Sequence, residues 1–321
     1  MKLADYFLPD NKRQWRLAKQ AGVDYGVLRL PYDTPGVDPF SLEYLRRLKE
    51  ELAQEGIKLA VIEPAPANQK IKLGLPGRDR ELEQMRRLIQ NMGTLGIEVL
   101  CYNFMAHIGW FRTSSTTPGR GGALVTSFDY ELVSPEPIET VGEVSAERLW
   151  DNYEYFIRSV IPAAEKANVK LALHPDDPPV SPLRGISRIF TDFASIRRAM
   201  ELVASPCHGV TFCQGCFAAM DEDLPRAIAY FGQQKKLFYV HFRDVVGCAR
   251  NFRETFHDEG KTDMARVLLA YKQAGFDGYI RVDHVPTMEG EANQKPGYET
   301  MGRLFAIGYL KGLLEGINYN F

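Results

Sequence analysis

Short apolar runs and longer amphipathic segments alternate eight times along this chain of 321 residues. The apolar runs predict buried β-strands, and the amphipathic segments predict helices. The segment Phe40 to Glu55, for example, carries Leu45, Leu48 and Leu52 at helical spacing and ends at Gly56. Because strands that alternate with helices form parallel sheets, and eight such units are enough to close a sheet on itself, the pattern predicts a (β/α)8 TIM barrel.

The predicted strands are residues 2–8, 25–30, 57–62, 97–104, 169–174, 209–213, 237–241 and 279–283. The predicted helices are residues 11–20, 40–55, 80–95, 146–167, 190–203, 224–234, 264–273 and 299–314. We expect one α/β domain over residues 1–321, with long loops after strands three and four and a loop insertion at about 105–145. The alternative is a doubly wound open sheet, which would normally carry a glycine-rich phosphate loop after its first strand. The sequence has no such loop.

Composition narrows the range of partners. The formal net charge is −2, so neither a nucleic acid nor an anionic membrane surface is an expected partner. No apolar run approaches the roughly 20 residues that span a bilayer, and the first residues lack the apolar core of a signal peptide. Five scattered cysteines indicate reduced thiols rather than a disulfide framework. We therefore expect a cytoplasmic protein that acts on a small molecule.

A histidine stands at the end of the fifth predicted strand, where Leu171-Ala172-Leu173 runs into His174-Pro175-Asp176-Asp177-Pro178-Pro179. The prolines stop strand pairing and prevent a helix, so the chain must turn sharply after the histidine. His174 is thus fixed at a strand end, which is the face of a barrel where its chemistry takes place. Asp176 and Asp177 are predicted to support this turn rather than to bind a metal.

Three further potential metal ligands end the next three predicted strands: Cys213, His241 and Asp283. Adjacent strand ends are neighbours around one rim of a barrel, so these side chains and His174 are expected to converge. Two imidazoles, a thiolate and a carboxylate suit a borderline divalent cation such as Mn²⁺, Fe²⁺, Co²⁺ or Zn²⁺. Each residue alone has a plainer interpretation, a buried small side chain for the cysteine and a structural role for a histidine. The repetition at four successive strands predicts a metal site.

Cys213 and Cys216 also form a C-x-x-C pair. Thioredoxin-like chemistry is the alternative for this pair, but it requires a helix N-terminus in a smaller fold. Cys101, Cys207 and Cys248 are interpreted as structural thiols.

The chain resembles the mannonate dehydratase family, which belongs to the xylose-isomerase-like group of TIM barrels. The stretches that carry the resemblance are Val61-Ile62-Glu63, Ile71-Lys72-Leu73-Gly74, Pro76-Gly77-Arg78-Asp79, Cys101-Tyr102-Asn103-Phe104-Met105, Trp110 with Arg112-Thr113, the His174–Pro179 string, Thr211-Phe212-Cys213, His241-Phe242-Arg243, Asp283-His284, Pro296-Gly297-Tyr298 and Gly302-Arg303-Leu304. The resemblance implies a metal-dependent hydro-lyase of hexuronate catabolism that converts D-mannonate to 2-keto-3-deoxy-D-gluconate. It also implies the same four metal ligands, with Mn²⁺ or Fe²⁺ as the expected ion.

The resemblance further implies that Tyr298 and the Asp283-His284 pair carry the proton transfers of the dehydration. Which group is the acid and which the base is open at this point. Plainer roles are an aromatic helix anchor for Tyr298 and a hydrogen-bonding neighbour of the metal ligands for His284. The family commonly has Arg-Pro-Asp-His-Gly here, followed by a basic residue, whereas this chain has Arg281-Val282-Asp283-His284-Val285-Pro286. That difference leaves the exact sugar acid open.

A sugar acid needs hydrogen-bond donors around it. Residues on the predicted loop face that could supply them are Arg112, Asn103, His107, Lys72, Arg243, His257 and Arg281. Arg112 is the preferred carboxylate clamp because a guanidinium can bind both carboxylate oxygens. The long loops are predicted to cover the substrate, with a disordered surface insertion as the alternative for residues 119–130.

Two other functions stay open from the sequence. One is a sugar isomerase or epimerase on the same barrel, and the other is a barrel that binds a sugar acid without turnover. The thiolate ligand and Tyr298 favour the dehydratase over the isomerase, and His284 with Tyr298 beside four ligands favours an enzyme over a binding protein. A homo-oligomer is expected.

Overall fold

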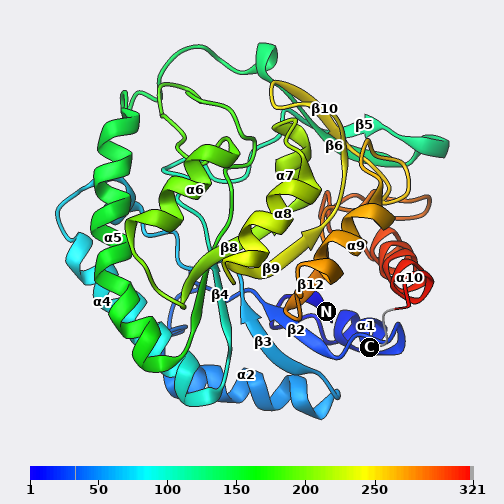
Figure 1. The fold of residues 1–321 in the computed structure, drawn as a ribbon, viewed down its shortest axis with the longest axis horizontal. Helices are drawn as coiled ribbons and strands as arrows, with labels where there is room; N and C mark the ends of the chain where they lie inside the picture. The colour runs from blue at the N-terminus through cyan, green and yellow to red at the C-terminus, as the bar shows by residue number, and fades with distance from the viewer. Residues whose placement is uncertain (33, 319–321) are drawn as a thin grey trace.

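Eight parallel strands close into a barrel in the computed structural model, which describes residues 1–32 and 34–318 (Figure 1). Around the barrel the neighbours are β1-β12-β9-β8-β7-β4-β3-β2, and each adjacent pair is parallel. The strands are β1 (Lys2–Phe7), β2 (Tyr25–Leu28), β3 (Lys58–Ile62), β4 (Val99–Tyr102), β7 (Lys170–Leu173), β8 (His208–Cys213), β9 (Leu237–Phe242) and β12 (Tyr279–Val282). The predicted α/β barrel is confirmed.

The eight predicted helices are present, together with two short ones, α3 and α7. Their bounds are α1 (Lys12–Gln20), α2 (Leu42–Gln54), α3 (Gln69–Leu73), α4 (Arg78–Leu95), α5 (Ala146–Ala167), α6 (Phe193–Leu202), α7 (Gln214–Ala219), α8 (Leu224–Gln233), α9 (Met264–Gln273) and α10 (Thr300–Gly316). Helix α6 starts three residues later than predicted, because Asp192 forms a capping box with Ser195 and fixes the first turn there.

The loops that follow β4 and β9 build a second sheet outside the barrel. This accessory sheet is antiparallel, in the order β10-β11-β6-β5, with strands β5 (Ser114–Pro118), β6 (Leu124–Asp129), β10 (Val245–Cys248) and β11 (Asn251–Glu254). The interpretation of 105–145 as a loop insertion was therefore incomplete, since β6 pairs with β11 from a distant part of the chain. A 3₁₀ turn (Arg120–Gly122) joins β5 to β6 and another (Tyr130–Leu132) follows β6, so the alternative of a disordered 119–130 is wrong.

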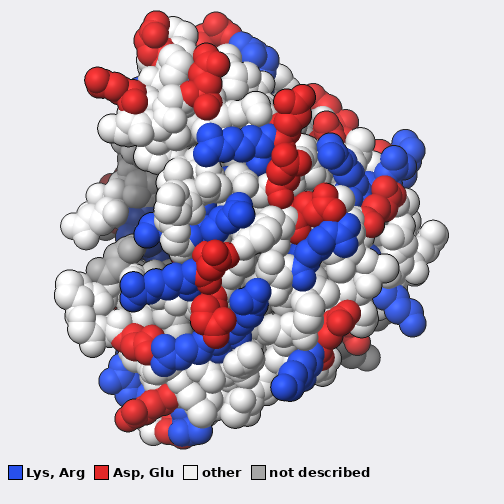
Figure 2. All heavy atoms as spheres, turned by 90° about the vertical axis from the view of Figure 1, so that its left-hand side faces the viewer, with Lys and Arg blue, Asp and Glu red and all other residues white. Residues whose placement is uncertain are grey.

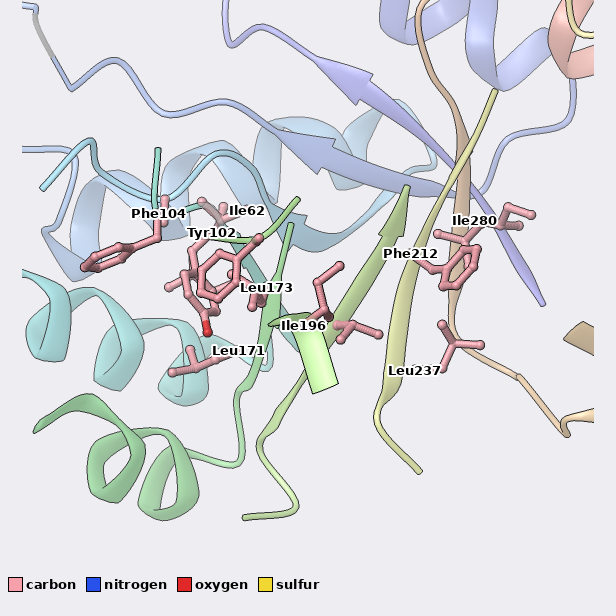
Figure 3. Close-up of a cluster of buried hydrophobic side chains, with 14 of the residues drawn as sticks. Ile62, Tyr102, Phe104, Leu171, Leu173, Ile196, Phe212, Leu237 and Ile280 are labelled. Carbon is pink, nitrogen blue, oxygen red and sulfur yellow. The ribbon is translucent and has the colours of Figure 1, made fainter. Parts of the chain in front are cut away.

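The pleat of the barrel strands sorts their side chains into two apolar layers. Leu171, Leu173, Phe212 and Ile280 face outward and pack against the helices (Figure 3). A smaller cluster from the strands alone fills the barrel, including Ala4, Val99, Cys101, Ala172, Tyr239 and Tyr279. Because side chains alternate with a period of two, the residue after each outward-facing one must point into the barrel.

The surface on the side of α4 and α5 carries both signs of charge. Figure 2 shows lysine and arginine interspersed with aspartate and glutamate across that face, without an extended region of one sign. Within the described residues, no helix is long and apolar enough to cross a membrane.

Replacing Phe156 of α5 tests the apolar packing between the barrel strands and the surrounding helices. Phe156 is 2 % exposed and packs against Tyr102, Phe104 and Tyr153. Phe156→Ala should lower the free energy of unfolding by about 3–5 kcal/mol, since it removes buried area and leaves a cavity. The control Leu132→Ala, at a side chain 71 % exposed, should change it by less than about 0.5 kcal/mol. Denaturant unfolding measures both, and equal effects would contradict the packing described here.

Candidate active site

The inward-facing residues at the ends of β7, β8, β9 and β12 meet at one rim of the barrel. Cys213 lies opposite His241 in the β8–β9 pairing, and His241 lies opposite Arg281 in the β9–β12 pairing. Asp283 is two residues beyond Arg281 and so points to the same side. His174 follows β7 directly, and its N–H donates to the carbonyl of Tyr102 on β4. The four residues predicted as metal ligands are thus brought together.

The distances within this group suit a shared cation. His174 Nε2 lies 3.2 Å from His241 Nδ1, which lies 3.5 Å from Asp283 Oδ2. The ligand atoms of Cys213, His241 and Asp283 lie within 4.8 Å of one another, and so do those of His174, Cys213 and Cys216. Two atoms that each bind one ion at about 2.1 Å, at angles of 90–110°, are themselves about 3.0–3.4 Å apart. The donor set therefore fits a divalent metal.

The thiol and the carboxylate of this group are held as anions. Burial alone raises the pKa of Cys213, but a hydrogen bond with Cys216 and the charge of Arg243 outweigh it and hold that pKa well below its ordinary value. For Asp283, burial is likewise outweighed by Arg281, His284 and His241, so its pKa is also well below normal. Arg243 Nε lies 3.3 Å from both Cys213 Sγ and Asp283 Oδ2.

A cavity of about 610 Å³ opens over this rim. Three of the four candidate ligands line it, namely His174, His241 and Asp283, whereas Cys213 lies beneath them and is fully buried. The other lining residues are Tyr6, Leu8, Arg29, Glu63, Pro64, Cys101, Tyr102, Asn103, Met105, Gly109, Trp110, Asp177, Arg281, His284, Lys295, Pro296 and Tyr298.

His284 reaches this cavity through an unusual backbone conformation. Strand alternation would turn it away from the barrel axis, because it directly follows Asp283, which points inward. The structure shows that the residue itself adopts a left-handed conformation, with φ at 32°. Its ring then lies 5.2 Å from the ring of Trp110 and 5.4 Å from that of Tyr298. A strained backbone of this kind persists where surrounding contacts hold it.

Tyr298 is placed by an isolated antiparallel bridge between Val285 and Gly297. The N–H of Val285 donates to the carbonyl of Gly297, whose φ of 82° turns the chain toward the site. The Tyr298 hydroxyl donates to Asp283 Oδ1 at 3.4 Å. Burial raises the pKa of Tyr298 well above its ordinary value, and the charge of Asp283 adds to this effect. Tyr298 therefore keeps its proton at neutral pH.

Two of the seven predicted substrate-binding residues line the cavity, Asn103 and Arg281. Arg281 donates to both oxygens of Glu63 and to Asp283 Oδ1. Lys72 lies under Asn103, to whose Oδ1 it donates at 3.0 Å. Burial lowers the pKa of Lys72 to about 7.

Like Lys72, the remaining four predicted substrate-binding residues do not line the cavity, so five of the seven lie outside it. His107 is exposed, and its backbone N–H donates to Gln69. His257 is fully buried beneath the rim, with Nε2 2.7 Å from the Phe242 carbonyl, and burial lowers its pKa to about 4. Arg112 and Arg243 are engaged with carboxylates instead.

Those two arginines and two carboxylates form a closed ring, which we term the rim ion cluster: Arg112, Asp177, Arg243 and Glu254. Arg112 donates to Asp177 Oδ1 at 2.5 Å and to Glu254 Oε1 at 2.5 Å. Arg243 donates to Asp177 Oδ2 at 2.8 Å and to both oxygens of Glu254. Each of the four side chains is 3 % exposed or less. Arg112 therefore does not occupy the position of a substrate clamp.

Sequence reasoning missed Glu63, which lines the cavity. Its Oε1 lies 3.0 Å from His241 Nε2, and its Oε2 accepts from Tyr239 at 2.8 Å. The sequence does carry a sign that Glu63 belongs to the site, because Glu63 ends an apolar run and precedes a proline, as His174 does. Glu254 had no such signal, since it belongs to an accessory strand that the pattern did not reveal.

Comparison with known proteins assigns this arrangement to a family. The family model described as D-mannonate dehydratase (UxuA) matches residues 6–141 and 135–321. The chain belongs to the mannonate dehydratase family. A mannonate dehydratase from Thermotoga maritima is 34 % identical, with 91 % of each chain covered, and mannonate dehydratase 2 from Halalkalibacterium halodurans is 32 % identical, with 98 % of each covered. The chain is accordingly an enzyme of the hydro-lyase class, a sugar-acid dehydratase.

Solved structures agree with this membership. The crystal structure of mannonate dehydratase from Streptococcus suis superimposes with a TM-score of 0.90 at 31 % identity, covering 98 % of this chain and 93 % of that one. A D-psicose 3-epimerase from Clostridium cellulolyticum superimposes with a TM-score of 0.64 at 14 % identity. The second likeness shows the barrel fold alone.

The rim ion cluster predicts a pH dependence of stability. Burial opposes ionisation of Asp177, but Arg112 and Arg243 outweigh it and lower its pKa to about 2 from the model-compound value of 3.8. The contribution of Asp177 to stability is therefore complete above about pH 4 and is lost as the pH falls through about 2. Relative to Asp177→Asn, the wild type should lose about 2 kcal/mol between pH 4 and pH 2.

Denaturant unfolding of both proteins at pH 7, 4, 3 and 2 measures this difference. Asp24→Asn is the matched control, because Asp24 pairs with Lys19 on the surface and its side chain is 66 % exposed. It should track the wild type at each pH. A difference between Asp177→Asn and the wild type that stays constant from pH 7 to pH 2 would contradict the assignment.

Proposed function

We propose that this chain converts D-mannonate to 2-keto-3-deoxy-D-gluconate and water, with a divalent metal held by His174, Cys213, His241 and Asp283. The observation that carries the proposal is the convergence of this donor set at one rim, where His174, His241 and Asp283 line the same cavity as His284 and Tyr298. The membership in the mannonate dehydratase family supports the choice of substrate.

The donor set of two imidazoles, a carboxylate and a thiolate suits a borderline divalent ion such as Mn²⁺, Fe²⁺, Co²⁺ or Zn²⁺. Among these we propose Mn²⁺ or Fe²⁺, which the resemblance to the mannonate dehydratase family implies. When bound, a divalent ion supplies Lewis acidity that stabilises the negative charge developing on the substrate carboxylate. The residues around the ligands hold them in position: Arg281 donates to Asp283 at 2.7 Å, and Glu63 lies 3.0 Å from His241.

Dehydration removes the proton from C2 and the hydroxyl from C3, and the resulting enol becomes the 2-keto acid. Tyr298 is the acid in this scheme, because its phenol, whose pKa is raised by desolvation, keeps its proton and can give it to the departing hydroxyl. His284 is the base, because its ring lies beside Tyr298 in the cavity and can take the C2 proton. The water that leaves carries the C3 hydroxyl oxygen and the proton from Tyr298.

The substrate carboxylate and hydroxyls need partners that line the cavity. Arg29 and Lys295 bring positive charge to its wall, and Asn103 brings an amide. Because Arg112 and Arg243 are saturated by carboxylates, we propose that Arg29, Lys295, Asn103 and Arg281 provide the polar contacts to the sugar acid. A homo-oligomer and a cytoplasmic location remain part of the proposal, and light scattering on the purified protein tests the first.

An activity screen tests the reaction. Protein stripped of metal and then supplied with Mn²⁺, Fe²⁺, Zn²⁺ or Mg²⁺ should be incubated with a panel of aldonic acids, and 2-keto-3-deoxy products should be assayed. D-Mannonate should be turned over with Mn²⁺ or Fe²⁺, and chelator should abolish the activity reversibly. Absence of a 2-keto-3-deoxy product from every acid with every metal would refute the proposal, and an epimerised sugar would favour the isomerase alternative.

Two variants separate metal binding from proton transfer. Cys213→Ser should bind the metal at least tenfold more weakly, because a hydroxyl replaces a thiolate. Tyr298→Phe should keep full metal content and lose about 10²- to 10⁴-fold in kcat, because only the proton donor is removed. Metal analysis and kinetics on the purified proteins measure both effects.

The control is Cys248→Ser, at a cysteine that is exposed and forms no disulfide. It should match the wild type in both assays. A Cys213→Ser protein with full metal content and activity would show that the donor set is assigned incorrectly.

A further inference from the structure

Glu254 joins the rim ion cluster to His284. Its Oε1 lies 3.0 Å from His284 Nδ1, and both side chains are buried, at 3 % and 4 % exposed. Because the same oxygen also receives hydrogen bonds from Arg112 and Arg243, it can act toward the imidazole only as an acceptor. The imidazole must then carry a proton on Nδ1.

We infer that Glu254 is a positioning residue for the dehydration, which fixes the His284 tautomer with its proton on Nδ1 and leaves Nε2 able to accept a proton. Nε2 lies 3.8 Å from Asp283 Oδ1, which is longer than a hydrogen bond, so this contact does not hold the proton on Nε2. This inference rests on the proposed function, in which His284 is the base. A neutral imidazole with its proton on Nε2 could not take a proton at that atom.

Glu254 lies next to His284 because it is the last residue of β11 in the accessory sheet. Glu254 ends β11 and pairs with Val245 of β10, while its neighbours Phe252 and Arg253 pair with Phe128 and Ser127 of β6. The two loops that build this sheet leave the barrel after β4 and β9. A carboxylate from outside the barrel thus reaches a side chain at the end of β12, which gives the accessory sheet a role in catalysis.

The two arginines keep the Glu254 carboxylate charged and in one orientation. Arg243 donates to Oε1 at 2.9 Å and to Oε2 at 2.8 Å, and Arg112 donates to Oε1 at 2.5 Å. The rings of Trp110 and Tyr298 also contact the imidazole, with ring centroids 5.2 and 5.4 Å away. Hydrogen bonding at Nδ1 and ring packing together fix both the rotamer and the tautomer of His284, just as a carboxylate that accepts from the far nitrogen of a metal-binding histidine fixes that ring.

The tautomer can be measured without turnover. Nitrogen-15 NMR distinguishes a protonated from an unprotonated imidazole nitrogen, and the chain has six histidines, so His284→Asn can identify the His284 signals. In the metal-free and the Mg²⁺-loaded wild type, the proton should lie on Nδ1. A proton on Nε2 in the wild type overturns the inference by itself, whatever the variants do.

Three variants separate the hydrogen bond from the charge. Glu254→Ala removes both the hydrogen-bond acceptor of His284 and the negative charge. Glu254→Gln keeps an acceptor oxygen on a side chain of the same length but removes the charge. Asp177→Asn removes a negative charge from the rim ion cluster and leaves the hydrogen bond between Glu254 and His284 in place. The Nδ1 proton should be partly lost in Glu254→Ala and retained in the other two. Identical tautomers in all three variants would show that Glu254 is only a counter-ion for the arginines.

Kinetics on D-mannonate give the second measurement. Glu254→Ala should lower kcat about 10- to 100-fold with KM within about threefold, and Glu254→Gln should recover a substantial part of that loss. An unchanged kcat in Glu254→Ala overturns the inference. If the wild type does not act on any aldonate, the proposed function fails instead, while the NMR result still decides whether Glu254 sets the tautomer.

Discussion

Closure of eight parallel strands is the constraint on which the rest of this molecule depends. It gathers the carboxyl ends of all strands on one rim, and the two-residue period of the pleat decides which side chains point inward there. The register sets Cys213 opposite His241 and His241 opposite Arg281. The candidate ligands therefore converge from residues far apart in the sequence without any short motif.

Buried charge is the second constraint, and it follows from the first. The rim holds Asp283, Glu63 and Arg281 as well as the four members of the rim ion cluster, all of them at most 10 % exposed. Removing such charges from water is costly unless each is paired with good geometry. The arginines satisfy the carboxylates, so the candidate ligands and His284 are held in place before a substrate arrives, which is what a preorganised site requires.

The sequence predicted the barrel because its signals are local. Apolar runs and helix caps are readable within a few residues, and the rule that a ligand-type residue ends each apolar run found His174, Cys213, His241 and Asp283. The same rule applied to Ile62-Glu63 would have found Glu63.

Other parts of the site depend on contacts that no local pattern shows. Glu254 and Arg112 take their positions from pairing between β6 and β11, which are more than a hundred residues apart in sequence. Arg112 was predicted as a substrate clamp because a guanidinium can bind both carboxylate oxygens, whereas the structure places it between Asp177 and Glu254. His284 enters the cavity through a backbone conformation that strand alternation does not predict.

The central claim is that the four strand-end residues hold one divalent ion beside His284 and Tyr298. A crystal grown with Mn²⁺, with diffraction data collected on both sides of the manganese absorption edge, tests it most directly. The account predicts one anomalous peak at about 2.0–2.4 Å from atoms of His174, Cys213, His241 and Asp283. A manganese peak at another place in the molecule, or a well-ordered rim with no anomalous signal at saturating Mn²⁺, would contradict it.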